Sequence, residues 1–178
     1  MYVYKYKTPL GYSDMMMKSD GTYLTGLWFI NSSDAIKHNN NFEIKELPII
    51  KETSKWLDIY FSGDIPNFMP KYKIENLTPF RSLVIDSIIK IPYGEVTTYN
   101  KIAIEIAKKR GIKKMSAQAV GGAVGWNPIC IIIPCHRVIS ENNSLTGYGG
   151  GIKNKIKLLE LENNDMKNFI IPTLGTKL

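Results

Sequence analysis

Alternation of polar and apolar residues at period two marks the first part of the chain. Residues 2–7 alternate in this way, and residues 12–18 and 22–30 form two more extended runs around Asp20-Gly21. Asp-Gly is a favoured dipeptide for a tight hairpin, and alternation places every second side chain on the same face of a sheet. We therefore expect a small antiparallel sheet at this end.

A helix and a linker follow the predicted sheet. Residues 31–41 are polar and are expected to form a loop, whereas residues 48–61 carry apolar side chains at near-helical spacing. Residues 62–78 contain one glycine and two prolines, which interrupt regular structure and indicate a linker. We accordingly divide the chain into an N-terminal domain, 1–75, and a C-terminal domain, 76–178.

Helical periodicity returns in the second half. Helices are predicted over residues 79–91, 99–109 and 117–124, each preceded by a hydroxyl residue: Thr78, Thr98 and Ser116. Serine and threonine favour this N-cap position because their side-chain oxygen accepts a hydrogen bond from the first turn. The last two helices are joined by a turn that contains Gly111. This pattern indicates a helix-turn-helix, which occurs as a packing unit and as a DNA-binding motif.

The third of these helices has an unusual composition. Its small residues are Ala117, Ala119, Gly121, Gly122 and Ala123. A helix that reads the major groove presents larger polar side chains to base edges. Small residues instead allow close approach, either to a neighbouring helix or to the minor groove of DNA. The basic residues before this helix would contact phosphates or form a solvated loop: Lys108, Lys109, Arg110, Lys113 and Lys114.

The run 131–139 brings a cysteine and a histidine together in a chain that has only two of each. Its β-branched residues predict a buried strand that ends at Pro134, because proline cannot donate to a sheet ladder. Cys135 would lie at the end of this strand, as an inert apolar side chain or as a nucleophile. A nucleophilic thiol needs a base or positive surroundings, and His136 and Arg137 are candidates for both.

A final helix is predicted over residues 153–163. Glu162 lies three and four residues after Leu159 and Leu158, so it shares their apolar face. A carboxylate there either is buried with a partner, for which His136 is the candidate, or reaches solvent at the helix end. In the first case Cys135, His136 and Glu162 would form a nucleophile, base and orienting group.

Composition narrows the class of protein without identifying a reaction. The 178 residues carry a net charge of +7 and are 44% apolar, which favours a polyanionic partner in a globular protein. The apolar runs are too short for a membrane span, and no signal-peptide core is present. Cys130 and Cys135 are poorly placed for a disulfide, and no Cys/His spacing suits a metal site. We expect a reducing, cytoplasmic location, or a nuclear one in a eukaryote.

Three segments together resemble one protein family: residues 116–128, residues 133–139 with their Pro-Cys-His-Arg core, and residues 145–151. They are similar to the signature of the O6-alkylguanine-DNA alkyltransferases, and the resemblance extends from residue 79 to residue 162. It implies an α/β (α+β) fold in two parts. These are a small N-terminal antiparallel sheet with a helix, and a mostly helical C-terminal domain with the helix-turn-helix and the active-site strand.

The resemblance also implies an activity, that of a methylated-DNA–[protein]-cysteine S-methyltransferase. Cys135 would attack the alkyl carbon on O6 of guanine, and His136 would act as its base through a water. Tyr99 would donate a hydrogen bond to the purine N3, and Asn127 would brace the loop that carries the cysteine. The base pocket would comprise the carbonyls of Cys135 and Val138, the backbone N–H of Gly149 and the ring of Tyr148.

Duplex DNA is the partner that the resemblance implies, with the target nucleotide flipped out of the stack. The residues assigned to DNA contact are Tyr99, Ala117, Gln118, Ala119, Gly121, Gly122 and Arg137. In the family an arginine commonly fills the vacated place in the stack, whereas this chain has Gln118. Glutamine lacks the charge and the planar stacking surface of arginine, so we expect flipping with weaker or more salt-sensitive binding.

The expected product is a thioether, which is stable in water, so each molecule would react only once. No cofactor or metal is expected, O4-methylthymine would be a second substrate, and the protein would act as a monomer without a membrane partner. One rival is a non-enzymatic DNA-binding regulator or damage sensor. The presence of Cys135 and the absence of base-reading side chains disfavour it. The other rival is a cysteine hydrolase, which would need an oxyanion hole and would turn over an ester or amide.

Overall fold

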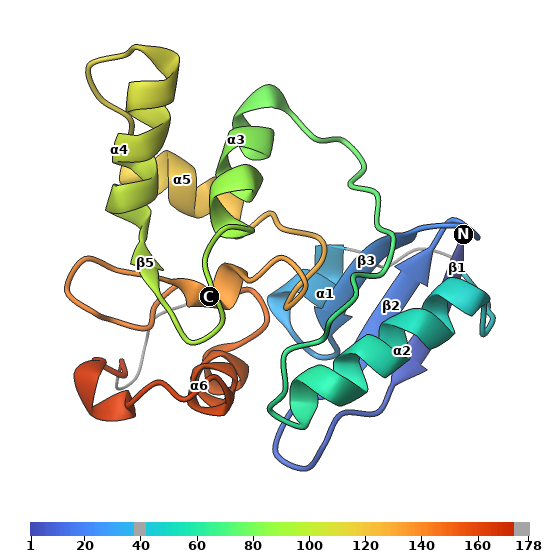
Figure 1. The fold of residues 1–178 in the computed structure, drawn as a ribbon. Helices are drawn as coiled ribbons and strands as arrows, with labels where there is room; N and C mark the ends of the chain where they lie inside the picture. The colour runs from blue at the N-terminus through green and yellow to red at the C-terminus, as the bar shows by residue number, and fades with distance from the viewer. Residues whose placement is uncertain (38–41, 173–178) are drawn as a thin grey trace. The chain divides into compact units, whose positions relative to one another are not determined.

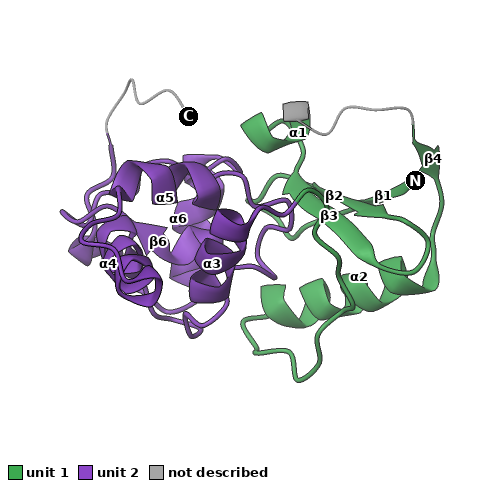
Figure 2. Ribbon diagram, turned by 90° about the horizontal axis from the view of Figure 1, so that it is seen from above, with its two compact units in different colours: residues 1–76 green, residues 77–178 purple. Residues whose placement is uncertain are grey.

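The computed structural model describes residues 1–37 and 42–172 of the chain. The chain divides into two compact units, Met1–Asn76 and Leu77–Leu178, which Figure 2 colours separately. Within the described segments, no helix has the length and apolar character that a membrane crossing requires.

A four-stranded sheet forms the basis of the first unit (Figure 1). Its strands are β1 (Tyr2–Tyr6), β2 (Met15–Ser19), β3 (Leu24–Phe29) and β4 (Glu43–Ile44), in the order β3-β2-β1-β4. The pairs β1-β2 and β2-β3 are antiparallel, as the alternation and the Asp-Gly turn predict. The short strand β4 was not predicted, and it pairs with β1 in parallel.

Helix α2 (Pro48–Phe61) covers one face of this sheet (Figure 1). Met15 and Met17 of β2 are fully buried, because alternation places both on the same face. The bounds predicted for this helix are confirmed. Part of the predicted linker is bonded to strand β3. The N–H of Leu24 donates to the Lys71 carbonyl at 2.9 Å, and the N–H of Lys73 donates to the Leu24 carbonyl at 2.9 Å.

The polar segment 31–41 was predicted to be a loop, and this is wrong for part of its length. Helix α1 (Ser33–Lys37) begins there, and the Ser32 hydroxyl accepts a hydrogen bond from the N–H of Ala35 at 3.4 Å. A local cap of this kind can start a short helix without an apolar pattern to announce it. The rest of the predicted loop, residues 38–41, lies outside the described residues.

Three capped helices open the second unit: α3 (Pro79–Ile88), α4 (Tyr99–Arg110) and α5 (Ala117–Val124). The predicted caps are present, because the side chains of Thr78, Thr98 and Ser116 each accept a hydrogen bond from the first turn that follows. Gly111 ends α4 in the left-handed conformation, with φ of 63°. The three helices pack against one another, so the predicted helix-turn-helix of α4 and α5 is formed.

The remaining elements of the second unit are a short strand pair, a helix and two 3₁₀ turns. Strands β5 (Thr97–Thr98) and β6 (Val138–Ile139) form a parallel pair, and α6 (Ile152–Leu161) follows a long loop. A small apolar cluster of Ile139, Leu145 and Leu159 joins β6, the loop and α6. Short 3₁₀ turns occupy Cys135–Arg137 and Met166–Asn168. The turn that carries the cysteine is therefore fixed by β6 on one side and by α6 on the other.

Candidate active site

Cys135 stands at the start of a 3₁₀ turn, and not at the end of a strand. The strand predicted over Ile131–Ile133 is wrong: this segment turns back on itself, with an isolated bridge between Cys130 and Ile133. Ile131 adopts a φ of 68°, a left-handed conformation that β-branched residues rarely take. The strand in this region is β6, which follows the cysteine.

The side chain of Asn127 explains why this buried apolar run turns back. Its amide nitrogen donates to the carbonyls of Ile129 and Ile133 at 3.3 and 2.9 Å, and its amide oxygen accepts from the Ile129 N–H at 3.0 Å. The side chain thus satisfies backbone groups that a neighbouring strand would otherwise satisfy. A run of β-branched residues signals burial, but it does not reveal such a local partner.

The same amide group reaches the sulfur. Asn127 Nδ2 donates to Cys135 Sγ at 3.1 Å, and the cysteine is only 5% exposed. An N–H aimed at the sulfur stabilises the charged form of the thiol over the neutral form. Asn127 therefore holds the turn and one face of the sulfur together, which suits the bracing role that the family resemblance implies.

His136, the next residue, pairs with a carboxylate from α6. Its Nε2 lies 2.8 Å from Oε1 of Glu162, and both side chains are fully buried. Glu162 is the C-cap of α6, on the face that its spacing from Leu158 and Leu159 indicates. Because Nε2 is engaged by the carboxylate, Nδ1 is the ring nitrogen through which His136 can take up a proton.

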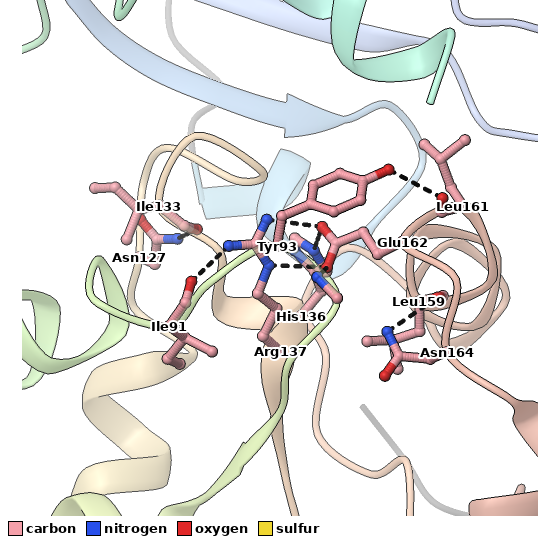
Figure 3. A network of polar contacts seen from close by, with 11 residues as sticks. Ile91, Tyr93, Asn127, Ile133, His136, Arg137, Leu159, Leu161, Glu162 and Asn164 are labelled. Carbon is pink, nitrogen blue, oxygen red and sulfur yellow. Dashed lines mark hydrogen bonds and ion pairs between the residues drawn. The ribbon is translucent and has the colours of Figure 1, made fainter. Parts of the chain in front are cut away.

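Arg137, for which we predicted a contact with DNA, has its side chain buried inside the protein. It is 8% exposed, and its Nε and NH2 donate to the two oxygens of Glu162 at 2.9 Å each (Figure 3). Its NH1 donates to the carbonyl of Ile91 at 2.7 Å. The 3₁₀ turn directs this side chain towards the end of α6.

Burial, hydrogen bonds and neighbouring charges together set the pKa values of Glu162 and His136. Burial opposes ionisation of Glu162, but the hydrogen bonds and charges of His136 and Arg137 outweigh it and lower its pKa to about 2. Burial lowers the pKa of His136, the hydrogen bond that it donates to Glu162 and the charge of that carboxylate oppose this change, and the charges of Arg137 and Lys155 add to it. At neutral pH the site therefore holds a carboxylate, a guanidinium and a neutral imidazole, which is the form that can accept a proton.

Tyr99 approaches the site from the first residue of α4. Its hydroxyl lies 3.4 Å from the carbonyls of Thr146 and Gly147, in the loop before α6. Burial, together with negative charge on Cys135, raises its pKa to about 12. Tyr99 thus stays protonated and remains a hydrogen-bond donor beside the sulfur.

The other predicted pocket residues lie on β6 and on the loop before α6. Tyr148 is 3% exposed, Gly149 is half-buried, and Val138 is fully buried. The carbonyl of Val138 accepts a hydrogen bond from Lys155 at 2.7 Å. A carbonyl oxygen has two lone pairs, so Val138 retains the capacity to accept a second donor.

Lys155 is the residue of this site that sequence reasoning missed. It is fully buried on α6, donates to the carbonyls of Val138 and Thr146, and lies with its ammonium 5.9 Å from the centre of the Tyr148 ring. Burial lowers its pKa to about 8, and negative charge on Cys135 opposes the change. Its position three residues before Leu158 placed it on the buried face, so helical spacing alone could have found it.

The predicted DNA-contacting residues of α5 lie apart from this cluster, on the outer face of the helix. Gln118, Ala119 and Gly122 are exposed, and Ala117 and Gly121 are half-buried. A Cβ at Gly122 would meet nothing within 4 Å, and a Cβ at Gly121 would touch only the Tyr99 ring, at 3.8 Å. Close packing within the protein therefore does not account for these glycines.

The described part of the chain shows no group of three or more His, Cys, Asp or Glu side chains that could hold a metal ion. The chemically distinctive groups that it brings together are Asn127, Cys135, His136, Arg137, Lys155 and Glu162, with Tyr99 at their edge.

Known proteins are similar to this chain in both sequence and fold. A family profile described as the DNA-binding domain of 6-O-methylguanine DNA methyltransferase matches residues 79–164. The chain is 34% identical over 162 residues to a methylated-DNA–protein-cysteine methyltransferase of Haemophilus influenzae, covering 91% of this chain and 86% of the relative. It is 42% identical over 124 residues to one from Methanosarcina barkeri, covering 70% and 75%. The crystal structure of Mycobacterium tuberculosis OGT in complex with DNA superimposes with a TM-score of 0.76 at 32% identity, covering 95% of each chain.

Proposed function

The chain belongs to the family of methylated-DNA–protein-cysteine methyltransferases, which repair DNA by alkyl transfer, and from this premise we propose the details of its reaction. Cys135 accepts the alkyl group of O6-alkylguanine in duplex DNA, irreversibly and once per molecule. O4-methylthymine is the second substrate, and the protein acts as a monomer.

The observation that carries this proposal is that Asn127 contacts the sulfur of Cys135 while the next residue, His136, is paired with Glu162. Neutral His136 can take the thiol proton through a bridging water, and Glu162 then stabilises the imidazolium. The sulfur, which Asn127 polarises, attacks the alkyl carbon, so a C–S bond forms as the C–O6 bond breaks. The electron pair of the broken bond stays on guanine.

The departing guanine needs a hydrogen-bond donor as this negative charge develops. Tyr99 lies beside the sulfur and keeps its proton, so it can donate to the purine N3 once it releases the loop carbonyls. The carbonyls of Cys135 and Val138 would accept from the exocyclic amine, and the N–H of Gly149 would support O6. The ring of Tyr148 would form the wall of the pocket.

The outer face of α5 supports the approach to DNA. A glycine in a helix interior costs roughly 0.5–1 kcal/mol relative to alanine, so two adjacent glycines that no internal packing requires point to an external surface. We propose that this face enters the minor groove while Lys113 and Lys114, both exposed before α5, meet phosphates. Gln118 would then bond the base left unpaired by flipping.

The product determines the number of turnovers. A thioether on Cys135 has no bond that water readily cleaves, and none of the neighbouring groups described above is a nucleophile placed to remove the alkyl group. The protein is therefore consumed as it repairs, in a stoichiometric reaction.

The test uses a duplex oligonucleotide with one O6-methylguanine. The intact protein is weighed after incubation and then digested to locate the added mass. We expect one added methylene on Cys135, none in Cys135→Ser, and no increase beyond one per molecule at any excess of DNA. Tight damage-selective binding without a mass change would support a sensor, and continued turnover of an ester would support a hydrolase.

A further inference from the structure

Arg137 occupies a buried position that the reaction scheme leaves without a role. The three nitrogens of its guanidinium all end inside the protein, two on Glu162 and one on the carbonyl of Ile91. Burying an ion pair carries a large desolvation penalty, and well-packed apolar side chains are often as stable. Stability alone is therefore a weak explanation for this arrangement.

The geometry of the pair is specific. Glu162 Oε1 receives both NH2 of Arg137, at 2.9 Å, and Nε2 of His136, at 2.8 Å. Its Oε2 receives Nε of Arg137 at 2.9 Å and the N–H of Gly94 at 3.4 Å. A guanidinium fork fixes the plane of a carboxylate, because rotating the carboxylate would break both parallel bonds at once.

Further contacts hold the fork itself in place. The ring of Tyr93 lies 5.8 Å from the guanidinium carbon of Arg137, and its hydroxyl donates to the carbonyl of Leu161 at 3.0 Å. Together with the bond from Arg137 to Ile91, these contacts tie the segment after α3 to the end of α6 (Figure 3). The carboxylate is thus held by Arg137 as well as by His136.

We propose that Arg137 is a positioning residue for alkyl transfer: it locks the Glu162 carboxylate so that His136 keeps its proton on Nε2 and presents Nδ1 as the base. The inference rests on the proposed function, since it takes His136 to be the base for Cys135. Arg137 acts through Glu162 and touches neither the sulfur nor the substrate base.

Charge adds a second effect that can be separated from geometry. The charged groups that act on His136 are Lys155 of α6, Glu162 at the end of that helix, and Arg137 from its own turn. The negative charge of Glu162 raises the pKa of His136, whereas the positive charges of Arg137 and Lys155 lower it. Removing the charge at Arg137 should therefore raise the pKa of His136 and move the acid limb of the pH–rate profile to higher pH.

Two substitutions separate the fork from the charge. Arg137→Lys keeps a cation but loses the bidentate contact, and Arg137→Met loses both. We expect each to slow single-turnover methyl transfer at neutral pH by about tenfold or more, because the base is no longer held in one orientation. Only Arg137→Met should shift the acid limb upward. Arg81→Met is the matched control: it removes an arginine stacked on Trp126 and should leave the acid limb in place.

A double-mutant cycle tests whether Arg137 acts through the carboxylate. If it does, Arg137→Met should cost far less in rate when Glu162 is already Gln, because the group that it positions has changed. A role of Arg137 that does not pass through Glu162 predicts equal costs in both backgrounds. Equal costs, or a wild-type rate in Arg137→Lys, would overturn the inference.

The tautomer of the His136 imidazole can be measured in the wild-type protein, without any variant. Nitrogen NMR of the His136 imidazole in the wild-type protein should show a neutral ring protonated on Nε2 at neutral pH. A ring protonated on Nδ1 would overturn the inference even if every variant failed to fold. If the wild-type protein shows the expected ring but never alkylates Cys135, the proposed function fails and the positioning of His136 stands.

Discussion

Around Glu162 the charged side chains are buried and bonded to one another, whereas the outer face of α5 presents small side chains with little packed against them. Glu162 is 1% exposed and meets both His136 and Arg137. A Cβ added at Gly122 would meet nothing within 4 Å. In the first region the charged groups are bonded to one another. In the second region the helix surface is left open.

The difference teaches how the protein can separate two tasks. A reaction centre needs fixed orientations, which buried hydrogen bonds provide because each is costly to break. A surface that enters the minor groove needs space for DNA, which small residues provide at a cost to helix stability. Substitutions in the first region should therefore disturb folding and chemistry together, and substitutions in the second should weaken DNA binding without a loss of stability.

The largest expected effect is that of Glu162→Ala. It leaves the guanidinium of Arg137 buried without its carboxylate, so the free energy of unfolding should fall by about 3–5 kcal/mol. Urea unfolding at neutral pH measures this loss. Glu160→Ala is the control on the same helix, because Glu160 is exposed, and it should stay within about 0.5 kcal/mol of wild type. A small loss in both variants would contradict the account.

Acid should weaken the same region in a defined range. The pKa of Glu162 is lowered from 4.5 to about 2, so its stabilisation is complete above pH 4.5 and is lost as the pH falls towards 2. The pKa of His136 is lowered from 6.5, so the unfolded chain takes up this proton first and stability begins to fall below pH 6.5. The carboxylate contributes about 3 kcal/mol at neutral pH by linkage. Stability measured by urea from neutral pH downwards should show this decline, and Glu162→Gln should flatten its lower part.

A large side chain on the outer face of α5 should weaken DNA binding and raise the stability of the protein. Gly122→Leu should lower affinity for duplex DNA by about tenfold or more, since a large side chain obstructs close approach. Its stability should rise by roughly 0.5–1 kcal/mol, because leucine favours a helix more than glycine does. Fluorescence anisotropy and thermal unfolding measure the two quantities. Loss of both would show that Gly122 serves internal packing.

The smallest effect is expected from the basic turn before α5. Lys113→Ala should reduce affinity to a similar degree for every DNA sequence and lower the slope of log affinity against log salt by about 1. Its unfolding free energy should change by no more than about 0.5 kcal/mol, because the side chain is exposed. An unchanged salt slope would remove Lys113 from the DNA-contacting surface.

Sequence reasoning succeeded where the signal is local. Thr78, Thr98 and Ser116 cap their helices as predicted, because capping depends on a few neighbouring residues. The inward position of Glu162 followed from helical spacing in the same way. These signals predicted the helix-turn-helix and placed Glu162 on the apolar face of its helix, with His136 as its candidate partner.

The failures concern contacts between side chains and distant backbone groups. The residues 131–133 turn back because Asn127 satisfies their backbone, and no periodicity records that contact. Arg137 was assigned to DNA contact through the family resemblance, whereas the sequence pattern did not reveal its partner Glu162, which lies 25 residues away at the end of α6. Such pairings depend on the tertiary fold, which pattern alone does not supply.

The most direct test of the separation compares one reaction on two substrates. Methyl transfer to Cys135 would be measured from duplex O6-methylguanine and from the free base O6-methylguanine, in the wild type, Gly122→Leu and Glu162→Gln. We predict that the ratio of the duplex rate to the free-base rate falls about tenfold or more in Gly122→Leu. In Glu162→Gln both rates should fall together, so that the ratio stays within about twofold of wild type. An unchanged ratio in Gly122→Leu would contradict the assignment of DNA approach to the outer face of α5.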